Sequence, residues 1–250
     1  MDIGNTEIGI GLYGGGAWRG RFRVRTVMGK TPDEYRTLLW SLLSGTGVNP
    51  GQLQRAAVGS VVPPLTHTFR ELLSGWLPIP PLMVGPGVRT GLNLQVDHPS
   101  QVGADLVANA VAAYHRFGEP CIAVDFGTAT TFTGVQDPGA LVGVAIAPGL
   151  GVAAESLARG AALLPEAALE PPPHALGKNT QAAMQSGLIF GYVGLVDELI
   201  GRLRAELGGT ARTVATGGHA PLIAPLAESI EVVDPWLTLE GLRLIAERNP

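Results

Sequence analysis

Hydrophobic and polar positions alternate near the start of the chain, and this pattern predicts a β-hairpin. Arginines stand on either side of Phe22 and Val24, so a strand over residues 22–26 would have one wet face and one buried face. Residues 8–13 are largely apolar and predict the partner strand. Gly14–Gly16 lies between the two segments and predicts the tip of the hairpin.

Three longer segments have the spacing and end signals of helices. Thr31 is an expected N-cap, since Pro32 follows it in the first turn, and this helix should end at Gly45. Apolar residues recur at helical spacing over 100–117, which predicts a second helix. Residues 180–207 predict a third and much longer one.

The remaining elements are short and complete an alternation of strands and helices. Strands are expected at 57–62, 121–124, 141–147, 213–215 and 230–233, and helices at 68–73, from 221 and from 238. Mixed units of this kind are typical of an α/β protein. In the long helix, Gly187, Gly191 and Gly194 fall on one face, which predicts close packing against another helix and a part of a contact between two copies of the chain.

A repeat divides the sequence into two similar parts. Asp2–Thr6 reads Asp-Ile-Gly-Asn-Thr, and Asp125–Thr130 reads Asp-Phe-Gly-Thr-Ala-Thr, 123 residues further on in a chain of 250. Each half would begin with a strand, the Asp-x-Gly turn and a second strand, so we expect halves at 1–118 and 119–250. Only Met1 precedes Asp2, whereas a buried strand needs about five residues. We therefore expect the true start to lie upstream.

The repeated turn suits the binding of phosphate. Its glycine lets the backbone turn tightly and bring N–H groups towards an anion, and threonine adds a hydroxyl donor. An aspartate at the end of a strand can hold a hydrated Mg²⁺ that bridges phosphates. A third glycine turn, Ala215–Gly218, follows a later strand. No Gly-x-x-x-x-Gly-Lys-Ser/Thr segment is present, which excludes a P-loop as the nucleotide site.

Composition narrows the class of protein. The chain is 46% hydrophobic and 15% charged, with a net charge of −4, so we expect a cytoplasmic globular protein that binds neither nucleic acid nor membranes. The low charge suggests that a second copy of the chain covers part of the surface. The charge-free stretch 138–154 is interrupted by proline and glycine, so it does not predict a membrane span. A single cysteine, Cys121, excludes internal disulfides.

Two turns at half-length spacing, followed by a third, resemble the superfamily of acetate kinases, sugar kinases, Hsp70 chaperones and actin. That resemblance implies an α/β fold of two ribonuclease-H-like halves, each a mixed β-sheet with flanking helices, with a cleft for ATP between them. More narrowly, the chain resembles the type III pantothenate kinases. The motifs that carry this resemblance are Asp2–Thr6, Gly59–Pro64, Thr90–Asn93, Gly103–Asp105, Asp125–Phe132, Ile146–Leu150, Leu164–Pro165, Gly177–Thr180 and Asp234–Leu242.

The resemblance implies an enzyme that phosphorylates pantothenate with ATP at the first committed step to coenzyme A. It implies a homodimer that needs Mg²⁺ and a monovalent cation, K⁺ or NH₄⁺. Asp105 would be the general base. Contacts to ATP are implied for Asp2, Ile3, Gly4, Asn5, Thr6 and Thr128, the monovalent cation for Asp125, Mg²⁺ through the phosphates for Asp2, and contacts to pantothenate for Val96, Gly103, Ala104, Asp105, Leu106 and Thr180.

Two positions depart from the family pattern at the substrate. Where the family has Gly-Ala-Asp-Arg, this chain has Leu106 in place of the arginine, and Val96 replaces a substrate-binding tyrosine. An arginine would supply a charge-assisted partner for the carboxylate of pantothenate, and leucine does not. Arg159 or Lys178 could supply the lost cation. Three readings remain at this stage: a pantothenate kinase with a rearranged pocket, a kinase for another alcohol, and a non-catalytic regulatory or interaction protein.

Overall fold

The computed structural model describes residues 1–161, 164–165 and 167–250, which form two compact units. The first unit comprises Met1–Leu92, Asp97–Ala112 and Thr238–Pro250, and the second comprises Asn93–Val96 and Ala113–Leu237. The last helix therefore groups with the first unit, and the units differ in extent from the expected halves 1–118 and 119–250.

A five-stranded sheet forms the centre of the first unit, in the order β3-β2-β1-β4-β5. β1 pairs antiparallel with β2 and parallel with β4, and β2 and β3 form the expected hairpin. The strands are β1 (Asp2–Ile3), β2 (Glu7–Gly14), β3 (Ala17–Arg25), β4 (Ala57–Ser60) and β5 (Leu82–Met83).

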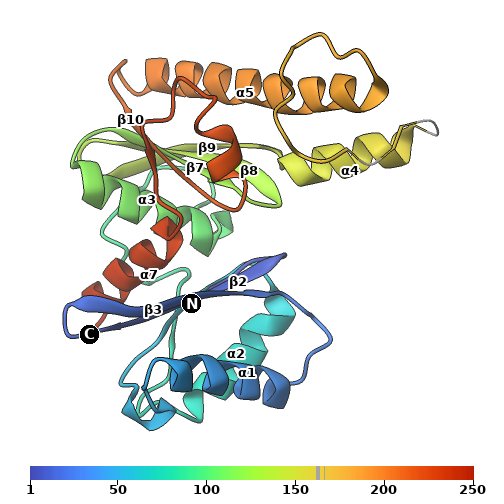
Figure 1. Ribbon diagram of the computed structural model, residues 1–250. Coiled ribbons are helices and arrows are strands. Elements are labelled where there is room, and N and C mark those ends of the chain that lie inside the picture. The colour runs from blue at the N-terminus through green and yellow to red at the C-terminus, as the bar shows by residue number, and fades with distance from the viewer. Residues whose placement is uncertain (162–163, 166) are drawn as a thin grey trace. The chain divides into compact units, whose positions relative to one another are not determined.

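Two helices, α1 (Pro32–Gly45) and α2 (Pro63–Ser74), cover one face of this sheet (Figure 1). Ile8 and Ile10 of β2 are buried there with Tyr35 of α1 and Phe69 of α2. Thr31 caps α1 as expected, and its side chain and that of Glu34 form a reciprocal capping box.

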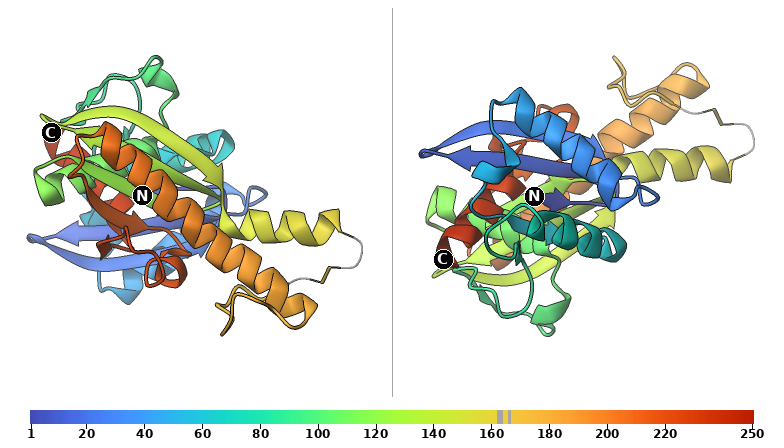
Figure 2. Two further views of the ribbon diagram at one scale, coloured as in Figure 1. Left: turned by 90° about the horizontal axis from the view of Figure 1, so that it is seen from above. Right: turned by 90° about the horizontal axis from the view of Figure 1, so that it is seen from below.

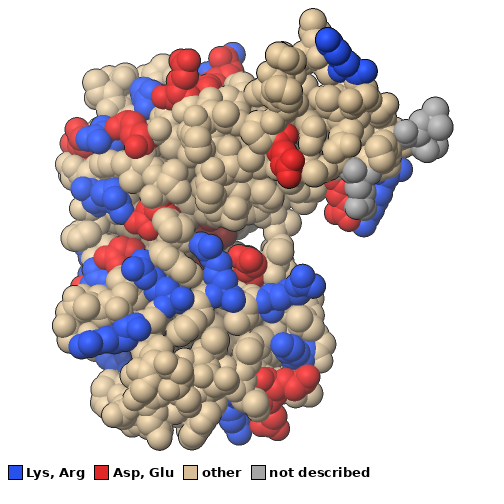
Figure 3. Space-filling view, in the orientation of Figure 1, with Lys and Arg blue, Asp and Glu red and all other residues tan. Residues whose placement is uncertain are grey.

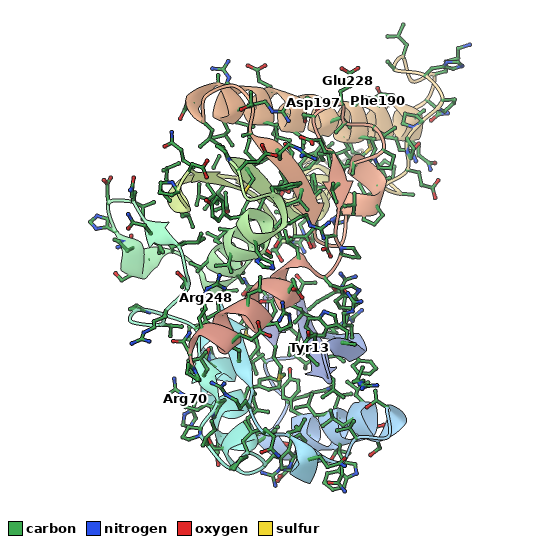
Figure 4. All side chains as sticks on the ribbon, turned by 90° about the vertical axis from the view of Figure 1, so that its left-hand side faces the viewer. Tyr13, Arg70, Phe190, Asp197, Glu228 and Arg248 are labelled. Atoms are coloured by element: carbon green, nitrogen blue, oxygen red, sulfur yellow. The ribbon has the colours of Figure 1, made fainter. Side chains whose placement is uncertain are left out.

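The opposite face of the sheet packs against α7 (Leu237–Arg248). A Cβ atom built on Gly9 would lie 3.7 Å from Leu239, and Trp18 Nε1 donates a hydrogen bond of 3.2 Å to Glu240. Tyr13 lies beside the same helix (Figure 4), and the guanidinium of Arg243 is 4.8 Å from the centre of its ring. The first unit thus has helices on both faces of its sheet.

The second unit contains a six-stranded sheet in the order β11-β10-β7-β8-β9-β6. β7 pairs antiparallel with β8 and parallel with β10. The strands are β6 (Asn93–Leu94), β7 (Cys121–Phe126), β8 (Ala129–Gln136), β9 (Ala140–Pro148), β10 (Arg212–Thr216) and β11 (Val232–Val233).

The long helix α5 (Thr180–Glu206) lies across the strands of the second unit (Figure 2). Its buried side chains, Leu188, Ile189, Tyr192, Val196 and Ile200 among them, pack on Ile122, Val124, Phe126 and Phe132 of β7 and β8. Asp197 lies next to Glu228 (Figure 4) and accepts a hydrogen bond of 3.0 Å from the backbone of Ser229. The remaining helices are α3 (Ala104–Phe117), α4 (Leu150–Gly160) and α6 (Ala220–Ile223), with 3₁₀ turns at Pro50–Gln52 and Pro99–Gln101.

The two sheets share one topology. The order β9-β8-β7-β10-β11 repeats β3-β2-β1-β4-β5, with the same parallel and antiparallel pairs. This duplication confirms the predicted α/β fold with two ribonuclease-H-like sheets.

Some predicted elements differ from the structure. α2 begins at Pro63 rather than Thr68, because proline fits the first turn of a helix. Pro63 and Pro64 therefore open the helix as well as following the strand before it. α3 begins at Ala104, since residues 99–101 form a separate 3₁₀ turn. None of the predicted helices corresponds to α4.

The prediction that Gly187, Gly191 and Gly194 pack against another helix is wrong within one chain. All three are exposed, and a Cβ atom built on any of them would meet no described atom within 4 Å. Their contact with a second copy stays a prediction.

Within the described part of the chain, no helix is both long and apolar enough to span a membrane.

Candidate active site

The first repeated turn joins β1 to β2 and is hydrogen-bonded to the residue that follows β3. Gly4 N–H donates to Glu7 O at 3.0 Å and closes the turn. Thr26, directly after β3, donates from Oγ1 to Gly4 O at 2.6 Å and from its backbone N–H to Thr6 O at 2.9 Å. Asn5 and Thr6 are exposed, so their donors can reach a ligand.

The start of α3 lies at the same edge of the sheet as the first turn. Asp2 is in register with Gly59 of β4, and Val61 N–H donates to Ile3 O at 3.1 Å. A Cβ atom built on Gly103 would lie 3.6 Å from Val61. The first turn and Gly103–Leu106 therefore gather at the carboxyl ends of two parallel strands, where open α/β sheets bind their ligands.

Asp105 is a half-buried carboxyl group in the first turn of α3. Its Oδ1 accepts a hydrogen bond of 2.9 Å from the backbone N–H of Leu106. Burial raises the pKa of Asp105 above its ordinary value, and the hydrogen bonds from backbone N–H groups oppose the rise without cancelling it. A raised pKa makes the ionised carboxylate a stronger base than an exposed one.

The second repeated turn joins β7 to β8 and rests on the residues that precede α4. Gly127 N–H donates to Ala129 O at 3.1 Å, and Gly149 N–H donates to Thr128 O at 3.1 Å. A Cβ atom on Gly149 would lie 2.3 Å from Thr128 O, so only glycine allows this close approach. Thr128 is exposed and Asp125 is half-buried.

The third glycine turn packs directly on the second. Thr216, the last residue of β10, is in register with Asp125 of β7. Gly217 follows with a φ of +91°, and a Cβ atom there would lie 2.6 Å from both Asp125 Oδ1 and Phe126 N. The two turns of the second unit thus also meet at the carboxyl ends of parallel strands.

A row of arginines on β3 was identified from the sequence only as a wet face. Arg23 is in register with Gly9, which is itself in register with Asp2, so all three lie on one face of the sheet. Arg23 also pairs with Glu7 at 3.9 Å. Figure 3 shows blue side chains gathered over the first unit. The alternation of arginines in the sequence predicted a solvent-exposed face of β3, but only the strand register shows that this face also carries Asp2.

The other predicted site residues take different positions. Ile3 and Ala104 are buried, at 0% and 8% exposure, so the structure does not open them to a ligand as the resemblance implies. Leu106 is half-buried on α3 in the first unit. Val96 is half-buried beyond β6, and Thr180 is the exposed first residue of α5, both in the second unit.

The donor set fits the predicted cations only with help from a nucleotide. The described residues contain no group of three or more His, Cys, Asp or Glu side chains that could hold a metal ion by itself. Mg²⁺ in phosphoryl-transfer sites keeps several waters and needs one or two carboxylates besides the phosphates. Asp2 at the first turn and Asp125 at the second are the carboxylates of the two repeated turns that could serve as such ligands.

Comparison with known proteins agrees with the duplicated fold and its turns. A family model described as type III pantothenate kinase matches residues 1–202. The chain belongs to the type III pantothenate kinase family. A member from Moorella thermoacetica is 45% identical over 249 residues, which cover 100% of this chain and 98% of that protein. A member from Roseiflexus sp. strain RS-1 is 48% identical with the same coverage.

Solved structures agree with the fold of this family. A protein from Campylobacter jejuni described as a conserved Baf family transcriptional activator matches with a TM-score of 0.64 at 17% identity, covering 100% of this chain and 97% of that one. Component A of (R)-2-hydroxyglutaryl-CoA dehydratase from Acidaminococcus fermentans matches with a TM-score of 0.52 at 14% identity, covering 100% and 97%. At such identities the likeness concerns the fold alone.

Proposed function

We propose that this protein transfers the γ-phosphoryl group of ATP to the primary hydroxyl of pantothenate, the first step of coenzyme A biosynthesis, in the cytoplasm. The observation that carries the proposal is the position of Asp105. Its half-buried carboxyl group lies at the strand edge that also carries the first turn, in a chain 45% to 48% identical to pantothenate kinases over its full length.

Phosphoryl transfer asks a protein mainly for positioning and for stabilisation of charge. In the proposed reaction Asp105 takes the proton of the primary hydroxyl of pantothenate, and the oxygen of that hydroxyl bonds to the γ-phosphorus of ATP. The bond between the γ-phosphorus and the oxygen that bridges it to the β-phosphate breaks, which releases ADP. The turn Asp2–Thr6 and Thr128 would hold the phosphates through N–H and hydroxyl donors. Mg²⁺ at Asp2 and K⁺ or NH₄⁺ at Asp125 would neutralise charge on them.

The proposed pocket for pantothenate contains the two departures from the family pattern, Val96 and Leu106. Leu106 adjoins the general base and supplies no cation to the carboxylate of the substrate. Thr180, Gly103 and Val96 are the other proposed contacts. Lys178 is exposed just before α5, while Arg159 pairs with Glu155 on α4. Either could take the place of the missing arginine.

A homodimer is part of the proposal. The support is the outer face of α5, where Gly187, Gly191 and Gly194 are exposed and leave the backbone open to close approach by a second helix. Glycine costs about 1 kcal/mol in a helix interior, and no described atom of the chain lies close enough to require it at these three positions. Sedimentation equilibrium of the whole protein would give the mass of a dimer under this proposal and of a monomer against it.

The test is an assay of ADP release with the whole protein, Mg²⁺ and K⁺, with and without pantothenate. Turnover that depends on pantothenate is the expected result. Turnover with another alcohol but not with pantothenate would favour a kinase of altered specificity, the reading that Leu106 and Val96 suggest. Binding of ATP without any turnover would favour a non-catalytic protein and overturn the proposal.

A further inference from the structure

Tyr192 carries the single hydroxyl group among the buried side chains of α5, and both sides of that hydroxyl are hydrogen-bonded. It is 7% exposed and points from α5 into the core of the second unit. Its hydroxyl donates to Pro148 O at 2.9 Å and is bonded on the other side to the hydroxyl of Thr130. A phenol has one proton, so Thr130 donates to Tyr192, which donates to Pro148.

Both ends of this chain of hydrogen bonds adjoin the second turn. Thr130 stands two residues after Thr128, and Pro148 is in register with Ala129 on the neighbouring strand. Gly149, next to Pro148, donates its N–H to Thr128 O at 3.1 Å. A shift of either Thr130 or Pro148 would therefore move Thr128.

The ring of Tyr192 meets the turn from its other side. Its centre lies 6.4 Å from that of Phe126, the residue after Asp125. One side chain of α5 thus contacts the residues before the turn, the residues after it, and the segment on which it rests.

The hydroxyl keeps its role as a donor at any physiological pH. Burial raises the pKa of Tyr192 above its ordinary value, so the group stays neutral and protonated. The other buried residues of α5, such as Leu188 and Val196, are apolar, so packing alone does not require an oxygen at this position.

We propose that Tyr192 is a positioning residue of the nucleotide site, whose hydroxyl fixes Thr128 and the N–H groups of the second turn where they hold the phosphates of ATP. The inference rests on the proposed function, because it takes the second turn as a phosphate site. Tyr192 itself touches no substrate; it acts through Thr130 and Pro148.

The test is Tyr192→Phe, which keeps the ring and removes the hydroxyl. We expect the dissociation constant of Mg·ATP, measured by titration calorimetry without pantothenate, to rise about tenfold, the size of one lost hydrogen bond with a buried partner left unpaired. The Michaelis constant for pantothenate should change less than about twofold, since the change is confined to the second turn. A general loosening of the protein would instead raise both constants.

The matched control is Tyr114→Phe. Tyr114 donates its hydroxyl to Asp137 at 2.8 Å beyond the far end of β8, so this variant loses an exposed hydrogen-bonded hydroxyl away from the turn and should bind Mg·ATP normally. Thr130→Val is a second route to the same chain of bonds, should Tyr192→Phe fold poorly. It should weaken Mg·ATP binding similarly, and the double variant no further than Tyr192→Phe alone.

Unchanged Mg·ATP binding in folded Tyr192→Phe or Thr130→Val would overturn the inference. So would a wild-type protein that binds no Mg·ATP, which would overturn the proposed function with it. A wild-type protein that binds Mg·ATP but does not phosphorylate pantothenate would contradict only the proposed function, and the comparison of variants would still decide the role of Tyr192.

Discussion

At the scale of single residues, Asp105 and Leu106 are neighbours in the sequence, but only Asp105 has the side chain expected for its proposed role. Burial at the start of α3 explains why the carboxyl group of Asp105 is suited to accept a proton. Leu106 is half-buried in the same helix turn, and under the proposed function it supplies no cation to the carboxylate of pantothenate.

The raised pKa of Asp105 has a consequence for stability. Between the ordinary carboxyl pKa and the raised one, the folded protein binds more protons than the unfolded chain, so stability falls as the pH rises through that range. Asp105→Asn removes this loss. Chemical denaturation between about pH 4 and pH 7.5 should show the free energy of unfolding of Asp105→Asn gaining on that of the wild type as the pH rises. Asp33→Asn, at an exposed carboxylate on α1, is the control. A difference that is constant with pH would contradict the burial of Asp105.

Restoring the cation at position 106 tests the interpretation of the substrate pocket. Leu106→Arg should lower the Michaelis constant for pantothenate about tenfold or more, because it adds a charge-assisted hydrogen bond to the carboxylate. Leu106→Met has a similar reach and no charge, and it should leave the constant unchanged. An unchanged or higher constant in Leu106→Arg would mean that another residue, such as Lys178 or Arg159, already holds the carboxylate.

At the scale of elements, the turn after β10 depends on the positive φ angle of Gly217. Gly217 has a φ of +91° and lies against Asp125 and Phe126, whereas a Cβ atom on Gly218 would meet no described atom within 4 Å. Gly217→Ala is therefore strained in its backbone and collides with the second turn.

We expect Gly217→Ala to raise the Michaelis constant for ATP about tenfold or more, and Gly218→Ala to change it less than twofold. Steady-state kinetics at saturating pantothenate measures both, and melting temperatures separate an effect on the site from unfolding. Equal effects of the two substitutions would show that the contact of Gly217 with Asp125 has no part in nucleotide binding.

The elements that the sequence predicted well are those with local signals. Thr31 and Pro32 predicted the start of α1, and the structure has the same cap. β5 and β6 have two residues each and pair through distant partners, so no local pattern distinguishes them from loops. α4 follows Gly149 without a side-chain cap, which explains why the usual start signal was missing.

At the scale of the whole molecule, the repeat was the most informative feature of the sequence. Asp2 and Asp125 are each the last residue but one of a central strand, and the sheets around them have the same order and directions. The sequence did not predict that Thr238–Pro250 groups with the first unit, nor that Arg23 shares a face with Asp2. Both depend on contacts between distant segments, which a strand or helix pattern does not encode. The glycines of α5 show the same limit, because their spacing predicted a contact that the described residues of one chain do not make.

The proposal that this molecule is a pantothenate kinase with Asp105 as its base is tested by pantothenate-dependent release of ADP from the whole protein, from Asp105→Asn and from the control Asp33→Asn. We expect turnover in the wild type and the control, a loss of about 100-fold or more in Asp105→Asn, and nearly unchanged ATP binding in all three. Full turnover in Asp105→Asn, or no response of the wild type to pantothenate, would contradict it.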